Sequence, residues 1–467
     1  MNVIMKTMKY FWLLCLAILP FSLIACSDDD DEGSTPMTID KIFLEDAKST
    51  VPDREVDFAR LGQMLRIQGS GFSGLKAIYV NGYKTQFNTT MVTDNNIWVT
   101  LSGKTPVETA ETDVRNTIRL VKSGTELVHN FTIRAAAPSI TSVSLTMPKP
   151  GETVVVRGSN LQEVVKVILP GDVELTNGIT NAPEEESGEW FSFVMPEGVT
   201  ASGSITAEGA NGTAISAAYF NNADCFIIDF DGLGNLGSWG QTYSADDLVD
   251  DPLNSGRGKV LQLIPQSVLD EGGIAAGART LLWATAGNDD PVDNWARMTQ
   301  FIPESTPASE VAIQFEICVP DEWNETGMLE VSLQNNLSTY GYGSADTQPS
   351  SEYLHQAGVW VPWLNSDNST TPFTTGTHWQ TVTLPLTTFG NYTEADDAHT
   401  FQNVIDDRNA GSYRNFLIFF VNNDVKISDD LVYEAKPSSQ LIYIDNLRIV
   451  PIKAPTVSDF NDDATEE

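Results

Sequence analysis

The chain has 467 residues, 27 of them basic and 63 acidic, which gives a formal charge of −36 at pH 7. No cluster of Lys and Arg follows the amino-terminal segment, and this argues against nucleic acid and anionic lipid surfaces as partners, since both need grouped positive charge. The length predicts about three domains, and an apolar content of 41% is enough to form their cores.

Residues 1–25 have the pattern of a signal peptide. Lys6 and Lys9 precede an apolar run that is too short and too soon interrupted to be a stable membrane span. The run ends in Leu23-Ile24-Ala25-Cys26, which resembles a bacterial lipobox. This resemblance implies that Cys26 is acylated and anchors the mature protein to the outer membrane. The alternative is an ordinary secretory signal with an incidental cysteine.

Residues 26–36 form an acidic tether. The sequence Ser27-Asp28-Asp29-Asp30-Asp31-Glu32 resembles the export tag of surface-displayed lipoproteins of Bacteroidetes, which implies that the protein faces the cell exterior. A plain solvated tether has the same composition, so this alternative stays open.

The cysteines do not form a disulfide framework. After Cys26, the mature chain holds Cys225 and Cys318, each within an apolar, strand-like segment. We predict two free, packed thiols, with a single bridge as the alternative.

Residues 37–135 and 136–222 contain an internal repeat. The sequence Leu65–Phe72, which includes Gly69, is echoed by Val154–Leu161, which includes Gly158. Short alternating segments between Gly, Asn and Pro turns predict two copies of an antiparallel sandwich. Strands that end in Gly-Ser-Gly-Phe or Gly-Ser-Asn-Leu resemble IPT/TIG immunoglobulin-like domains. The second copy departs from this pattern at Asn160 and Pro170.

Residues 223–452 form a larger domain of different character, and residues 453–467 are an acidic tail. Seven of the ten tryptophans lie in the larger domain. No helical period of any length is visible, so we predict an all-β sandwich of jelly-roll type. The predicted strands are Phe226–Phe230, Val260–Ile264, Val311–Val319, Leu329–Gln334, Trp379–Leu386, Phe416–Val421 and Leu441–Ile449. The opening Phe230-Asp231-Gly232, the late Trp379–Leu386 and the closing Tyr443–Ile449 resemble carbohydrate-binding-module sandwiches, in which the first and last strands pair.

The stretch from Tyr353 to Trp379 is the candidate ligand-binding region. Trp360 and Trp363 lie three residues apart around a proline, so they do not follow the alternation of a buried strand. Exposed aromatic rings on loops are suited to stacking on the apolar faces of sugars. The alternative is that these rings close one end of the sandwich core.

The predicted aromatic platform is centred on Trp360 and Trp363. Turn residues flank Trp295 and Trp323 and favour exposed rings there as well. Tyr353 completes the candidate glycan-binding set. Trp379 opens a well-patterned strand and is expected in the core.

The sequence predicts no cofactor, and the four histidines have no metal spacing. If the terminal strands pair, Asp229, Asp231 and Asp445 come together, so a structural Ca²⁺ is one interpretation, and acids that cap strand ends in water are the other.

The order of lipobox, acidic tag, two IPT/TIG-like domains and an aromatic-rich sandwich resembles the surface glycan-binding lipoproteins of Bacteroidetes polysaccharide-utilisation systems. The resemblance covers the whole chain and implies a non-catalytic protein that binds a neutral plant-type polysaccharide such as a β-glucan, xyloglucan or another hemicellulose. It also implies a partnership with an outer-membrane transporter complex, with the two repeats as a spacer. The alternatives are a glycoside hydrolase, which needs two carboxylates at a set separation, and a structural adhesin.

Overall fold

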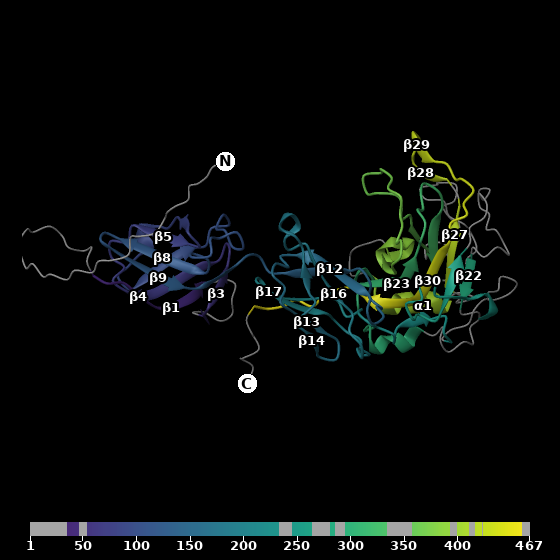
Figure 1. Ribbon diagram of the computed structural model, residues 1–467, viewed down its shortest axis with the longest axis horizontal. Helices are drawn as coiled ribbons and strands as arrows, with labels where there is room; N and C mark the ends of the chain where they lie inside the picture. The colour runs from purple at the N-terminus through teal and green to yellow at the C-terminus, as the bar shows by residue number, and fades with distance from the viewer. Residues whose placement is uncertain are drawn as a thin grey trace, which may run out of the picture.

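The computed structural model describes residues 35–45, 54–232, 245–263, 281–284, 295–333, 357–392, 399–410, 416–422 and 424–459. Their strands form three bodies in a row along the long axis of the molecule (Figure 1). One α-helix occurs among these residues, and the predicted all-β class is confirmed. No helix within these ranges has the length and apolar character needed to cross a membrane.

The first body is a sandwich of two four-stranded antiparallel sheets with a short parallel pair beside them. The alternating burial of its strands places a single apolar core between the sheets. The sheet orders are β2-β1-β4-β7 and β6-β5-β8-β9. The strands are β1 (Thr38–Glu45), β2 (Arg54–Glu55), β3 (Phe58–Arg60), β4 (Met64–Ser70), β5 (Ala77–Val80), β6 (Tyr83–Thr85), β7 (Asn96–Thr100), β8 (Thr117–Lys122), β9 (Thr125–Asn130) and β10 (Thr132–Arg134), and β3 and β10 form the parallel pair.

The second body repeats this arrangement. Its sheet orders are β11-β12-β16-β15 and β14-β13-β17-β18. The strands are β11 (Ser139–Val143), β12 (Thr153–Ser159), β13 (Lys166–Leu169), β14 (Val173–Leu175), β15 (Thr180–Asn181), β16 (Trp190–Val194), β17 (Thr206–Gly209) and β18 (Gly212–Ile215). The repeated sequences fall on the equivalent central strands β4 and β12, so the internal repeat is a structural repeat.

The repeated glycines mark a close crossing of backbones. A Cβ atom on Gly69 would lie 1.9 Å from the Thr38 carbonyl oxygen, and one on Gly158 would lie 1.8 Å from that of Ser139. Both crossings occur beside a bulge in the first strand of the sheet. Only glycine allows strands to approach this closely, which explains why the motif recurs.

The third body is a larger sandwich. Its first sheet has the order β20-β21-β30-β23-β26, with β19 also paired to β30, and its second has the order β22-β27-β24-β25. The strands are β19 (Phe226–Ile228), β20 (Val249–Asp250), β21 (Lys259–Leu263), β22 (Leu281–Ala284), β23 (Val311–Cys318), β24 (Met328–Ser332), β25 (Ala357–Trp360), β26 (Gln380–Pro385), β27 (Phe416–Val421) and β30 (Ile442–Pro451). A hairpin of β28 (Val425–Ser428) and β29 (Leu431–Tyr433) projects from one end (Figure 1).

All seven predicted strands of this body are present, and the predicted pairing of the first and last strands is confirmed by the β19–β30 ladder. A short helix accompanies the strands, although the sequence showed no visible helical period. Helix α1 (Phe401–Ala410) buries Phe401, Val404, Ile405 and Arg408, which have helical spacing. The helical period is not visible in the sequence because Arg408, a charged residue, is the fourth residue of the buried face.

The second and third bodies are joined by a buried polar network. Arg448 in β30 makes two hydrogen bonds to the Glu316 carboxylate, at 2.7 and 2.9 Å, and both side chains have no exposed surface. The same guanidinium donates to Thr146 of the second body. The Thr146 backbone N–H donates to the Thr381 hydroxyl at 2.8 Å. The outer face of the first sheet is therefore covered by the second body.

The carboxy-terminal segment returns to the junction between the first and second bodies (Figure 1). Asp459 accepts two hydrogen bonds from the Arg60 guanidinium, at 2.6 and 2.5 Å. Arg60 also donates to the Asn211 carbonyl oxygen of the second body at 2.8 Å. Three parts of the chain that are distant in sequence thus meet at one arginine.

Candidate functional site

A cluster of aromatic rings in the third body comprises Phe315, Trp323, Trp360, Phe373 and Phe420. Trp323 is 1% exposed and Trp363 is 0% exposed, so the prediction that these two rings are exposed was wrong. The Trp323 indole N–H donates to the Thr326 carbonyl oxygen at 2.6 Å, and that of Trp363 donates to the Gly327 carbonyl oxygen at 2.8 Å. One turn thus supplies both acceptors and draws the two rings into the core.

Trp295 is also buried, with 2% of its surface exposed, so the prediction of an exposed ring was wrong here too. It begins the 3₁₀ segment Trp295–Gln300 and packs against Phe416, with a centroid separation of 6.5 Å. The guanidinium of Arg408 from α1 lies 4.0 Å above its ring. A preceding turn did not leave this ring on the surface because α1 packs over it.

Trp360 differs from these three rings because it is only partly buried. It ends β25, the edge strand of the second sheet, where its Cα faces Leu329 of β24. An edge position leaves one side of the residue without a neighbouring strand. The structure therefore retains Trp360 as a candidate for ligand contact.

Three aromatic rings hold Trp360 in place. The centroids of Phe315, Trp323 and Phe373 lie 6.4, 6.2 and 5.2 Å from that of Trp360, and their planes are inclined to it by 84°, 89° and 83°. Edge-to-face contacts of this kind stabilise a fixed ring orientation. Trp360 is thus held rigid before any ligand arrives, which lowers the entropic cost of binding.

The indole N–H of Trp360 is available to a ligand. It donates to no described residue, whereas those of Trp323 and Trp363 are satisfied. It is also not among the polar atoms that are buried without a partner, so solvent reaches it. A partly exposed indole with a free donor can stack on a sugar ring and donate to a hydroxyl group at the same time.

Phe373 extends this surface and was not among the predicted site residues. It is partly exposed, and its backbone forms an isolated bridge with that of Trp323, with N–O distances of 2.8 and 2.9 Å. Phe373 falls within the stretch from Tyr353 to Trp379 that the sequence singled out. Its position beside Trp360 depends on the bridge to Trp323, which the sequence pattern does not encode.

The loop between Trp363 and Phe373 is fixed by its own hydrogen bonds. Asn365 donates to the hydroxyls of Ser369 and Thr371, both at 2.9 Å. Asp367 accepts from Ser369, and the side-chain and backbone hydrogen bonds of this serine lower the pKa of Asp367. Tyr433 in β29 donates to the Asn368 carbonyl oxygen at 2.7 Å. The chain beside the aromatic surface therefore has a defined shape.

Two further predictions concern core residues. Trp379 is 4% exposed, and its indole N–H donates to Asp251 at 3.1 Å, so its predicted burial is confirmed. It packs in the apolar cluster between the second and third bodies. Cys225 and Cys318 are free and buried, as predicted, and burial raises the pKa of their thiols to about 12 and about 11. Such thiols have little thiolate near neutral pH and are poor nucleophiles.

The acids considered for Ca²⁺ have protein partners. Asp231 accepts from the Lys259 backbone N–H at 2.9 Å. Asp445 lies 3.8 Å from Arg257, and burial raises its pKa well above its usual value. Within the described ranges, no group of three His, Cys, Asp or Glu side chains is placed to hold a metal. Cys26 and Tyr353 lie outside the described residues.

Comparison with known proteins finds relatives of this architecture. Over 217 residues the chain is 25% identical to an IPT/TIG domain-containing protein of Bacteroides ovatus, a match that covers 44% of this chain and only 43% of that relative. The crystal structure of the surface glycan-binding protein PbSGBP-B of Prevotella bryantii superposes with a TM-score of 0.62 at 19% identity. It covers 90% of this chain and 100% of that structure, so the two share a fold.

Residues 220–451 match the family model of the surface glycan-binding protein B xyloglucan-binding domain. This range covers every strand of the third body, from β19 to β30, together with all the aromatic residues just described. The family is described as a binding domain, so the third body is assigned to the non-catalytic class. The third body of this protein thus belongs to the family of surface glycan-binding protein B xyloglucan-binding domains.

Proposed function

We propose that the protein is a non-catalytic, cell-surface lipoprotein that binds a neutral β-glucan of the xyloglucan type, with Trp360 at the centre of the binding surface. The observation that carries this proposal is the rigid, partly exposed Trp360 indole with its unused N–H group. Its place inside the segment that matches a xyloglucan-binding family supports the choice of ligand.

The chemistry of the surface agrees with a neutral glycan. Phe373 and Trp360 offer apolar faces to the C–H groups of a pyranose, and each such contact is worth about 1–3 kcal/mol by analogy with aromatic stacking on bases. The formal charge of −36 disfavours acidic polysaccharides through long-range repulsion.

The proposed anchor is the lipid on Cys26, with the acidic segment Asp28–Glu32 directing the protein to the cell exterior. In this arrangement the first two bodies hold the third away from the membrane and near an outer-membrane transporter complex. Cys26→Ala is expected to release the protein from the membrane fraction. A Cys26→Ala protein that still sediments with membranes would contradict the anchor.

The binding site is tested with Trp360→Ala in native affinity gels that contain xyloglucan, mixed-linkage glucan, mannan or no polysaccharide. The variant is expected to lose at least about tenfold in affinity for xyloglucan, since stacking and a hydrogen bond are both removed, while its thermal midpoint changes little.

The chain offers two matched controls. Trp98 in β7 and Trp190 in β16 are also partly exposed tryptophans on strands, one in each of the other bodies. Their alanine variants are expected to bind as the unaltered protein does. If Trp360→Ala migrates like these controls in xyloglucan gels, the binding surface lies elsewhere.

A further inference from the structure

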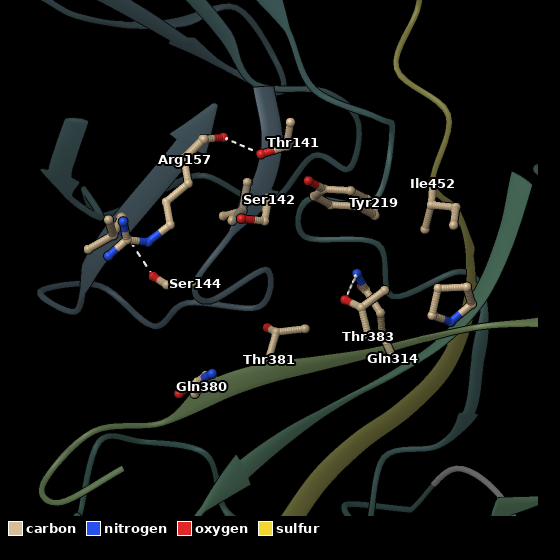
Figure 2. Close-up of a pocket in the computed structure, with 13 residues that line it drawn as sticks. Thr141, Ser142, Ser144, Arg157, Tyr219, Gln314, Gln380, Thr381, Thr383 and Ile452 are labelled. Atoms are coloured by element: carbon tan, nitrogen blue, oxygen red, sulfur yellow. Dashed lines mark hydrogen bonds between the residues drawn. The ribbon is translucent and has the colours of Figure 1, made fainter. Parts of the chain in front are cut away.

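A cleft of about 500 Å³, with polar and apolar surface in about equal parts, separates the second body from the third (Figure 2). Its two walls are the open edges of two sheets: β11 is the edge strand of the second body, and β26 is the edge strand of the third. In Figure 2, Ser142 and Arg157 lie on the first wall, and Gln380 and Thr383 lie on the second. The volume falls in the range of small-molecule sites, about 300–1,000 Å³.

The closed end of the cleft is rigid. The Thr381 backbone N–H donates to the Ser144 carbonyl oxygen at 2.8 Å, so the two edge strands are joined directly there. Behind this contact lies the buried pair of Arg448 and Glu316. The hydrogen bonds from Arg448 and Thr381 to the second body hold the two walls together at this end.

Four polar side chains at the cleft have no hydrogen bond to a described residue. Tyr219 is 6% exposed, and its hydroxyl is turned towards Ser142 across the space (Figure 2). Ser142, Arg157 and Gln380 are exposed, and their side-chain polar groups also have no described protein partner. Burial raises the pKa of Tyr219 to about 12, so the phenol stays protonated and can donate. Convergent, unused polar groups around a preformed cavity are the usual mark of a ligand site.

The lining also defines the chemical class of the ligand. In a chain with 63 acidic residues, none of the residues that line the cleft is acidic, and Arg157 is the one charged residue among them. The other free groups are hydroxyls and a carboxamide, which pair with hydroxyl groups. The ring of Tyr219 packs in the core of the second body, so its hydroxyl is the part of this residue that a ligand can reach.

We propose that this cleft is a second saccharide site, which takes one neutral glycosyl unit of the polysaccharide at a point distinct from Trp360. This inference rests on the proposed function for the nature of the ligand and adds a second contact from the same chain. Two weak sites on one rigid protein raise the overall affinity for a polymer without raising the affinity for a single sugar.

The test uses the protein from residue 27 onward, with methyl glucoside and methyl xyloside as probes and saturation-transfer NMR as the measurement. In the Trp360→Ala protein, transfer to the probes is expected to persist. Adding Ser142→Trp, which fills the cleft, is expected to abolish it, whereas Thr176→Trp, an exposed change in the same body, is expected to leave it intact.

Tyr219→Phe gives an independent arm because the hydroxyl has no partner in the fold, so the variant is expected to keep its melting temperature. Its affinity for the probes should fall about threefold to tenfold, as the loss of one hydrogen bond predicts.

Equal transfer in the Ser142→Trp and Thr176→Trp proteins would overturn the inference, and so would the absence of transfer in the Trp360→Ala protein. Tighter binding of methyl glucuronide than of methyl glucoside would overturn the assignment to a neutral sugar. Xyloglucan gels of Trp360→Ala test the first proposal alone. If that variant still binds xyloglucan, the cleft is tested by the difference in transfer between the Ser142→Trp and Thr176→Trp proteins, so the two proposals fail separately.

Discussion

At the scale of single residues, the tryptophans of the third body differ in where their indole N–H groups find an acceptor. The carbonyl oxygens of Thr326 and Gly327 take those of Trp323 and Trp363, and both rings are buried. Trp360 has no such acceptor and keeps part of its surface in solvent. The turn at residues 326 and 327 therefore anchors two of the buried rings, whereas Trp295 is buried without an acceptor for its indole N–H.

This division predicts the behaviour of Trp363→Ala. Because Trp363 is fully buried and hydrogen bonded, its truncation should lower the free energy of unfolding by about 3–5 kcal/mol. Urea unfolding measures this loss, with Trp98→Ala as the control for a partly exposed ring. A midpoint shift no larger than that of Trp98→Ala would show that Trp363 is not a core residue.

Asp251 gives a second prediction at this scale. Burial tends to raise its pKa, but hydrogen bonds from Leu253, Ser255 and Trp379 outweigh burial and lower it. A carboxylate whose pKa is lowered by folding stabilises the protein above its unfolded pKa of about 3.9, and this contribution is lost as the pH falls through the folded value.

Asp251→Asn is therefore expected to reduce the free energy of unfolding at pH 7 by about 1.5–3 kcal/mol, the range for hydrogen bonds to a charged group. The difference between the variant and the unaltered protein should shrink below about pH 4. Urea unfolding at a series of pH values checks this, and a difference that does not depend on pH would refute the role of the carboxylate.

At the scale of elements, the strands were predictable because their patterns reflect burial on one or both sides. β27 is buried on both faces and reads as a continuous apolar run, and its predicted bounds agree with the structure. β25 (Ala357–Trp360) was missed, since four residues at a sheet edge carry too short a pattern. Whether Trp363 and Phe373, which follow β25, are buried or exposed depends on packing between segments that are distant in sequence. A local sequence pattern cannot predict such packing.

The close approach of β1 and β4 at Gly69 can be tested by substitution. Gly69→Ala would place a methyl group 1.9 Å from the Thr38 carbonyl oxygen, so β1 must move away from β4. We expect a loss of about 1–3 kcal/mol, as for other overpacked sites. Gly103→Ala is the control in the same body, because no atom lies within 4 Å of its new methyl group. Equal thermal midpoints for the two variants would contradict the close approach of the β1 backbone to Gly69.

At the scale of the whole molecule, the second body is part of the scaffold of the third and not a freely jointed spacer. Leu145 of the second body packs with Val260, Cys318, Trp379 and Tyr443 on the outer face of the first sheet. Arg257 from the third body pairs with Glu152 of the second at 2.7 Å. The orientation of the glycan-binding domain is therefore set by the second body, and the first is joined to both through Arg60, Asn211 and Asp459.

The contact between the second and third bodies should stabilise the third body. A fragment of residues 224–467 exposes the apolar surface that Leu145 covers and loses the hydrogen bond from Arg448 to Thr146. Its free energy of unfolding should be lower by at least about 2 kcal/mol than that of residues 136–467, from the burial of one leucine alone. Both fragments lack the first body, so the difference between their thermal midpoints reports the effect of the second body on the third.

The folded part of the shorter fragment should still bind xyloglucan, because Trp360 and its supporting rings remain. Equal melting of the two fragments would mean that the second body is a separate spacer, and a loss of binding in the folded shorter fragment would place glycan contacts across the contact between the two bodies.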